Sequence, residues 1–93
     1  MKALWKNVIL AESDKTIIIE GNHYFPPESV NKKFFIESNN HTRCGWKGVA
    51  SYYTIKIDNE ENKDSAWYYD KPLDKAKHIT NYVAFWKGIQ IES

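Results

Sequence analysis

A strand pattern runs through Val49-Ala50-Ser51-Tyr52-Tyr53-Thr54-Ile55-Lys56-Ile57, where β-branched and aromatic residues recur with a period of two rather than with helical spacing. Successive side chains of a strand point to opposite faces, so one face would carry Val49, Ser51, Tyr53, Ile55 and Ile57 and the other Ala50, Tyr52, Thr54 and Lys56. The first set is the more apolar. We therefore expect that face to be the buried one, with Tyr53 pointing inward.

Beyond this strand the chain is typical of a long hairpin. The polar stretch from Asp58 to Asp64 indicates an exposed reversal, and Ser65 to Asp70 returns as a second strand. On that second strand, alternation places Trp67 and Tyr69 on one face and Ala66 and Tyr68 on the other.

A shorter hairpin is predicted nearer the start of the chain. The runs Thr16–Glu20 and His23–Phe25 flank Gly21-Asn22, a pair that tolerates positive φ and suits a tight turn. These two runs should be antiparallel neighbours.

Helix is limited to two short segments. The first follows Pro26-Pro27, because Val30 and Phe34 lie four residues apart and Pro27 suits a helix start. The second follows Pro72, where three apolar residues recur every three positions as in a helical turn laid over a sheet edge: Leu73, Ala76 and Ile79.

The remaining organisation is simple. Tyr82–Trp86 and Ile89–Ile91 close the chain as strand, with a bend at Gly88, and no repeat or linker interrupts the sequence. The 93 residues include four Trp, six Tyr and four Phe, whose large apolar areas supply much of a small core. We expect a mainly β protein with a single domain over residues 1–93.

Charge and cysteine content narrow the classes of function. Thirteen basic and twelve acidic residues give a net charge of +1 without a basic block, so a small-molecule partner is favoured over nucleic acid or a membrane. One cysteine allows neither an internal disulfide nor a Cys-x-x-Cys zinc site, and no metal or cofactor is indicated.

Met1–Leu10 lacks the hydrophobic run of a secretory signal, so a cytoplasmic protein is expected. A monomer and a homodimer are both compatible with the sequence.

Cys44 is the first candidate for chemistry, since a thiolate is a strong nucleophile and a cation such as Arg43 or Lys47 would favour it. Nucleophilic catalysis also needs a base, and His41 lies three residues away. The alternative interpretation is a small buried hydrophobe at a strand start next to a solvated loop histidine.

Lys47 lies between Trp46 and Gly48, where missing side-chain bulk lets a ligand approach the main chain and the ammonium group could hold a carboxylate or phosphate. Gly45 and Gly48 could equally serve only the turn. Several aromatic side chains could complete a ligand-binding pocket with Cys44, Trp46 and Lys47, because their rings and polar tips both contact ligands: Tyr24, Tyr53, Trp67 and Tyr69. Core packing is the competing role for each ring.

Acidic residues give little support for metal-dependent transfer. Asp58, Glu60, Glu61 and Asp64 cluster in the predicted reversal, and no paired Asp-x-Asp carboxylates lie on a strand. Glu20, next to the first hairpin turn, is the one acidic residue that remains a candidate for a functional role.

Motifs along nearly the whole chain resemble one family, the domain of unknown function 427. They are Ser13, Glu20-Gly21-Asn22, Tyr24-Phe25-Pro26, the Thr-x-Cys-x-x-Lys-Gly run from Thr42 to Gly48, Ala50-Ser51-Tyr52-Tyr53, Ala66-Trp67-Tyr69, Pro72 and Val83-Ala84-Phe85. The resemblance implies a compact fold similar to the β-tent, a small open barrel of antiparallel strands, and it carries a nucleotidyltransferase-like label. The chain departs from the family at Gly45, often proline, and at Arg43, often smaller. Some other β-tent proteins bind zinc through paired cysteines, which this chain lacks.

Three functions follow as hypotheses. The leading one is a pocket for a small metabolite, anionic or neutral, with Cys44 and Lys47 as polar contacts and with catalysis undecided. The second is a non-catalytic interaction or scaffold module that uses an aromatic face or an unpaired sheet edge. The third is a nucleotidyltransferase-like enzyme.

Overall fold

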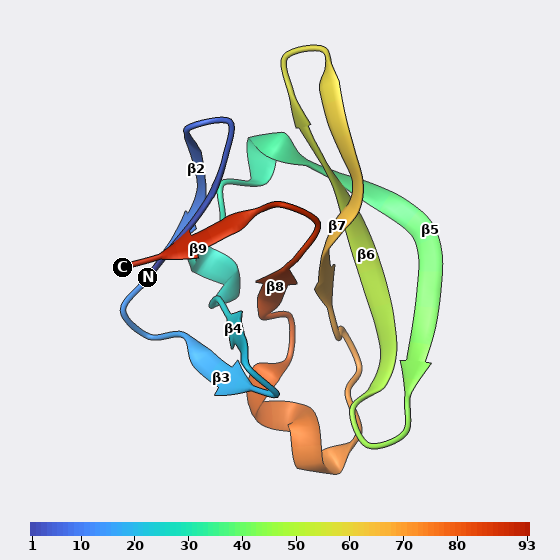
Figure 1. Cartoon of the computed structure of the whole chain (residues 1–93). Helices are drawn as coiled ribbons and strands as arrows, with labels where there is room; N and C mark the ends of the chain where they lie inside the picture. Colours follow the sequence, from blue (N-terminus) through green and yellow to red (C-terminus); the bar gives the residue numbers. More distant parts are fainter.

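The computed structural model describes residues 1–93 and contains nine strands in three antiparallel sheets (Figure 1). The largest sheet has the strand order β5-β6-β7-β8, the second has the order β2-β1-β9, and the third is the hairpin β3-β4. The sheets wrap around a shared interior but do not join into a closed barrel. The predicted mainly β, open architecture is therefore confirmed.

The four-stranded sheet is built around the strand that the sequence indicated most clearly. This strand is β6, Gly48–Ile57, and it pairs with β5, Phe35–Cys44, on one side and with β7, Glu60–Tyr68, on the other. β8, Val83–Phe85, completes the sheet beside β7.

The predicted long hairpin is thus confirmed, but its reversal is shorter than expected. Ile57 pairs directly with Glu60, so only Asp58 and Asn59 form the turn, and Asp58 has a φ of 54°. The exposed reversal predicted as far as Asp64 is wrong, because strand pairing starts again immediately after the two-residue turn.

Both faces of the four-stranded sheet are covered. On β6, Ile55 and Ile57 belong to a first buried cluster, whereas Ala50 belongs to a second one. Val49 is 40% exposed, so the predicted drier face is wrong at this end of the strand. The period of two holds, but a sheet that packs on both sides buries residues of both alternating sets.

On β7 the predicted alternation is confirmed. Ala66 and Tyr68 pack in the first cluster, and Trp67 and Tyr69 pack in the second.

A bulge bends β7 opposite Thr54. Tyr53 pairs with Ala66 and Ile55 pairs with Asn62, so Thr54 alone faces the segment 63–65. Asp64, in the middle of that segment, has a φ of 54°, and its N–H donates to the Thr54 hydroxyl at 3.2 Å. The bulge also holds Trp86, whose indole donates to the Asp64 carbonyl at 2.7 Å.

The sheet β2-β1-β9 brings the two ends of the chain together (Figure 1). Its strands are β1, Lys2–Trp5, β2, Val8–Glu12, and β9, Gln90–Glu92. β1 lies in the middle, and Lys2 pairs with Glu92. The predicted strand Ile89–Ile91 corresponds to β9, and the expected bend occurs at Gly88, which has a φ of 84°.

The short hairpin near the start of the chain is confirmed, with a shift of one residue at its turn. β3, Ile17–Ile19, pairs with β4, Asn22–Tyr24, and Ile19 faces Asn22. The turn is therefore Glu20-Gly21, not the predicted Gly21-Asn22, and both turn residues have positive φ, 55° and 81°. Two-residue hairpin turns with positive φ at both positions match the twist of the strands.

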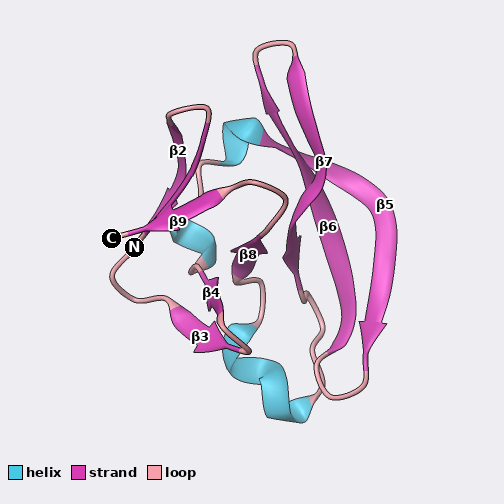
Figure 2. Cartoon of the chain, viewed as in Figure 1, coloured by secondary structure: helices cyan, strands magenta, loops and turns pink.

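The helical segments are three short 3₁₀ helices (Figure 2). They are η1, Pro27–Ser29, η2, Lys32–Phe34, and η3, Asp74–Ile79. The single helix predicted after Pro27 is wrong, because Val30 is extended and bridges to Ala11. None of these helices is long and apolar enough to cross a membrane.

The three-residue spacing predicted after Pro72 is confirmed in η3, since a 3₁₀ helix has three residues per turn. Ala76 and Ile79 are buried, whereas Leu73 precedes the helix and is exposed.

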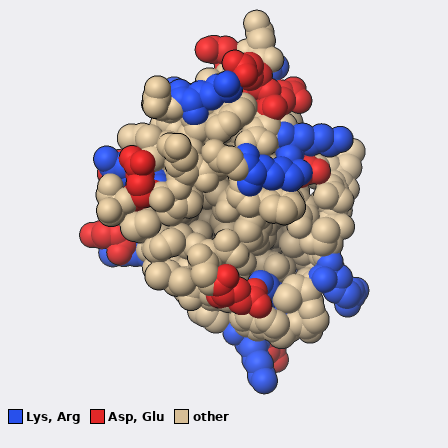
Figure 3. Space-filling view, viewed as in Figure 1, with Lys and Arg blue, Asp and Glu red and all other residues tan.

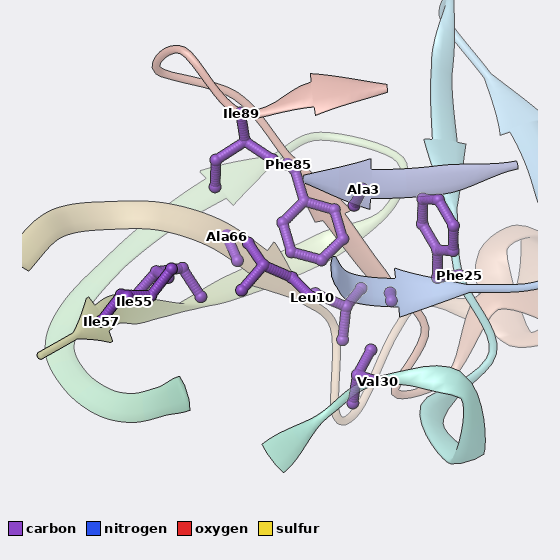
Figure 4. Packing of buried hydrophobic residues seen from close by; sticks show 11 residues of the cluster. Ala3, Leu10, Phe25, Val30, Ile55, Ile57, Ala66, Phe85 and Ile89 are labelled. Carbon is purple, nitrogen blue, oxygen red and sulfur yellow. The ribbon is translucent and has the colours of Figure 1, made fainter. Parts of the chain in front are cut away.

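The first cluster is the main hydrophobic core, and Figure 4 shows its side chains pointing toward one another from strands and connecting segments along the whole chain. Within it, the ring of Phe85, on β8, packs edge to face against that of Phe25, with the centroids 5.6 Å apart. The second cluster lies on the other face of the sheet and contains Tyr24, Ala50, Tyr69, Ala76, Ile79 and Ala84.

The core predicts a clear difference between two isoleucine substitutions. Ile55 is 0% exposed and Ile18 is 62% exposed. Ile55→Ala should lower the free energy of unfolding by about 2–5 kcal/mol, because it leaves a cavity in the first cluster. Ile18→Ala should change it by about 0.5 kcal/mol or less. Urea denaturation measures both values, and similar losses in the two variants would contradict the assignment of the core.

Candidate functional site

A hollow of about 180 Å³ lies over the second cluster and opens to solvent. Five side chains line it: Lys47, Tyr52, Trp67, Tyr69 and Trp86. Four are aromatic, and Lys47 carries the only charge in the lining.

The turn between β5 and β6 places Lys47 beside the segment that leads into η3. The Leu73 N–H donates to the Lys47 carbonyl at 3.0 Å. Gly48 has a φ of 108°, and a Cβ at this position would meet the Leu73 backbone nitrogen at 3.4 Å. Gly48 thus serves both the turn and the close approach of the two segments, whereas Gly45 has no atom within 4 Å of a Cβ position.

The ammonium group of Lys47 is buried but paired. Lys47 is 6% exposed, and its Nζ forms an ion pair with a Glu20 carboxylate oxygen. The same Nζ lies 5.4 Å from the centroid of the Trp46 ring and 5.7 Å from that of Tyr69, within the range of cation–π attraction.

The ion pair shifts the pKa of both partners. Burial alone would lower the pKa of Lys47, but the hydrogen bond with Glu20 outweighs it, and at high pH the ionised forms of Tyr24, Tyr69 and Cys44 add to this effect. The pKa of Lys47 is therefore raised above 10.5. The hydrogen bond and charge of Lys47 lower the pKa of Glu20 below 4.5, although the Glu20 side chain is 55% exposed. At neutral pH the pair is therefore fully ionised.

The two indole N–H groups of the lining are already satisfied. Trp67 Nε1 donates to the Tyr24 hydroxyl at 3.2 Å, and Trp86 Nε1 donates to the Asp64 carbonyl. The Trp67 and Trp86 rings meet edge to face, with centroids 6.1 Å apart. These tryptophans can offer a ligand their ring surfaces but not their hydrogen-bond donors.

The two phenol groups of the lining differ. The Tyr52 hydroxyl hydrogen-bonds with Thr42 Oγ1 at 2.8 Å, whereas the Tyr69 hydroxyl has no protein hydrogen-bond partner. Burial raises the pKa of Tyr69 to about 12, so this phenol is neutral at physiological pH and can donate a hydrogen bond.

The structure gathers only some of the seven predicted ligand-binding residues around the hollow. Lys47, Trp67 and Tyr69 line it. Tyr24 is fully buried beneath Trp67, Cys44 packs at the border of the second cluster, and Trp46 lies outside against the lysine.

Tyr53 is on the other side of the sheet. Its ring stacks on that of Tyr68 with centroids 4.6 Å apart, and burial raises its pKa to about 12. The prediction that Tyr53 points inward is confirmed, but its ring packs against the first cluster, on the face of the sheet opposite the hollow.

Two lining residues, Tyr52 and Trp86, are absent from the sequence prediction. The alternation along β6 places Tyr52 on the face predicted to be more exposed, but in the structure its ring packs against the second cluster. Trp86 had been placed within a strand, but β8 ends at Phe85 and the bulge at Asp64 holds the indole.

The pairing of Cys44 with His41 that nucleophilic catalysis would need is not formed. His41 lies within β5 rather than in a loop, and its Nδ1 hydrogen-bonds with the Asn39 carbonyl at 3.1 Å. Residues three apart on a strand point to opposite faces, so the imidazole and the thiol diverge. No group of three or more His, Cys, Asp or Glu side chains is arranged to hold a metal ion.

The Glu20–Lys47 pair predicts a pH dependence of stability. Because folding lowers the pKa of Glu20, the pair stabilises the folded state above pH 4.5, and this contribution is lost as the pH falls through the lowered pKa. The free energy of unfolding should therefore fall more steeply in acid for wild type than for Glu20→Gln. Urea denaturation from neutral pH to about pH 3 tests this, with Glu60→Gln, which removes the exposed Lys6–Glu60 pair, as the control. Parallel curves for wild type and Glu20→Gln would contradict it.

Comparison with protein families adds to this geometry. Residues 1–92 match the sequence model of a family described as Domain of unknown function (DUF427). No curated protein matches the chain. Since the family match spans all but the last residue, and the resemblance noted from the motifs points the same way, the chain belongs to the DUF427 family.

Proposed function

We propose that this protein binds a small metabolite in the hollow over the second cluster, with Lys47 as the contact for an anionic group. One observation supports this most strongly: the only charge in an aromatic-lined hollow is a buried ammonium group whose ionic partner is a half-exposed carboxylate. Ligand sites are typically apolar concavities with a few well-placed polar groups.

The lining suits a ligand with both an apolar and a polar part. Tyr52, Trp67 and Trp86 supply ring surfaces, and Lys47 and the Tyr69 hydroxyl supply hydrogen-bond donors. Cys44 packs against the second cluster, so we propose for it a supporting role beside the lysine. Its thiol is free.

A reducing compartment, the cytoplasm, is the proposed location of the protein.

The surface charge favours a small ligand over a polyanion. Figure 3 shows Lys and Arg interspersed with Asp and Glu around one face of the molecule, with uncharged residues between them. A nucleic-acid surface would gather basic residues in one patch or stripe.

A second candidate function is protein interaction through the edge strand β5. This strand is ten residues long, pairs only with β6, and exposes most of its side chains. Unpaired edges are templates for added strands from another chain. Light scattering would support this function if it showed a dimer that dissociates in an Ile36→Lys variant, which places a charge on the exposed edge strand.

The ligand-binding function is tested by a metabolite screen with thermal shift and native mass spectrometry. A ligand at ten times its Kd should stabilise wild type by about 1.4 kcal/mol, which is a rise in Tm of about 5–10 °C. Lys47→Ala should lose this rise for anionic ligands. Lys33→Ala removes a lysine that also lies over an aromatic ring, 5.1 Å from Phe34, and should keep the wild-type response. Failure of every compound to bind wild type would overturn the proposal.

A further inference from the structure

We propose that the ligand is a single-ring aromatic monocarboxylate, whose carboxylate pairs with Lys47 by displacing the Glu20 carboxylate. Glu20 thus acts as an internal competitor for the ammonium group of Lys47. This inference rests on the proposed function, because it names the ligand class and the regulation of that same pocket.

The size of the hollow suits a ligand whose buried part is about one ring. A cavity of about 150 Å³ is large enough to hold benzene. The hollow here measures about 180 Å³, which leaves room for one ring and a substituent of a few atoms. Most of a nucleotide would lie outside this space, in solvent.

The lining favours a planar ring over an aliphatic ligand. Tyr52, Trp67 and Trp86 present ring faces and edges, and aromatic pairs gain stability in offset-stacked and edge-to-face arrangements. The donors of both indoles are engaged with Tyr24 and Asp64, so these rings recognise shape and not hydrogen-bond acceptors.

Charge balance favours one carboxylate on the ligand. Lys47 is buried and protonated, and a buried charge needs a partner. In the structure that partner is a carboxylate oxygen of Glu20. A ligand carboxylate would replace it with the same charge and the same kind of hydrogen bond, whereas a dianion would leave one excess charge.

Glu20 is placed so that it can leave. It lies in the two-residue turn between β3 and β4, and its side chain is already 55% exposed while that of Lys47 is 7% exposed. Moving the Glu20 carboxylate fully into water requires little free energy, because about half of its side chain is already exposed. Lys47 has no such freedom, so the lysine stays in the pocket and exchanges its partner.

Competition of this kind lowers the apparent affinity for anions. The apparent Kd is the intrinsic Kd divided by the fraction of molecules in which the binding position is free. Glu20 therefore sets a threshold concentration for anionic ligands and has no such effect on neutral rings.

Isothermal titration calorimetry with benzoate, benzamide and acetate tests the proposal. Benzoate should bind Glu20→Gln about tenfold more tightly than wild type, which corresponds to a pocket that is free in about a tenth of wild-type molecules. Benzamide, which is neutral, should bind both equally, and acetate, which lacks the ring, should bind both much more weakly than benzoate. Lys47→Met should lose the preference for benzoate over benzamide. Glu60→Gln removes a carboxylate of similar exposure that pairs with Lys6, and it should match wild type.

A second measurement uses wild type alone and does not depend on how the variants fold. When benzoate saturates the pocket, the carboxyl pKa of Glu20, followed by nuclear magnetic resonance, should return from its lowered value towards 4.5. A pKa that stays lowered in the complex would overturn the displacement of Glu20.

The outcomes separate this inference from the function beneath it. Benzamide binding that shifts the Trp67 and Trp86 indole resonances, with no gain for benzoate in Glu20→Gln, would overturn the competitor role and keep a pocket for neutral ligands. Acetate binding as tight as that of benzoate would overturn the single-ring class. An absence of benzoate binding to wild type and Glu20→Gln at about 10 mM would overturn the inference, and a failed metabolite screen would overturn the proposed function as well.

Discussion

Burial of the four-stranded sheet on both faces is the constraint on which the other features of this structure depend. At the end of β7 and in the residue that follows it, Ala66 and Tyr68 pack in the main core while Trp67 and Tyr69 pack in the second cluster. One short segment therefore builds the core and one wall of the hollow at the same time. A strand with only one covered face would leave one of these sets in water. The aromatic content of the chain thus serves two small packed layers rather than a single core.

Several elements could be predicted because local rules decide them. The alternation on β6 and β7, the tight β3-β4 turn, predicted to within one residue, and the three-residue spacing in η3 all arise from backbone geometry over a few residues. The helix expected at Val30 failed for a non-local reason, because Val30 bridges to Ala11 and is held extended. Tertiary pairing there overrides helical spacing.

The candidate site was harder to predict because its parts come from distant segments. The Glu20–Lys47 pair joins residues 27 positions apart, and nothing in either local sequence specifies the partner. Trp86 reaches the hollow only because a bulge opposite Thr54 turns the Asp64 carbonyl towards its indole. Tyr53 is one of the aromatic residues predicted for the site, but the sheet separates its ring from that of Tyr52 and places the two rings in different clusters.

The pairing of β1 with β9 has a mechanical consequence. The two strands are antiparallel, and Lys2 lies opposite Glu92, so residues 1 and 93 emerge from the same end of this pair. A tension applied between these residues would load the hydrogen bonds one after another, starting at Lys2 and Glu92. The hydrogen bonds between β1 and β9 would then break in sequence, and β9 would separate from the sheet. The molecule would therefore yield to stretching at low force, even though its four-stranded sheet is packed on both sides.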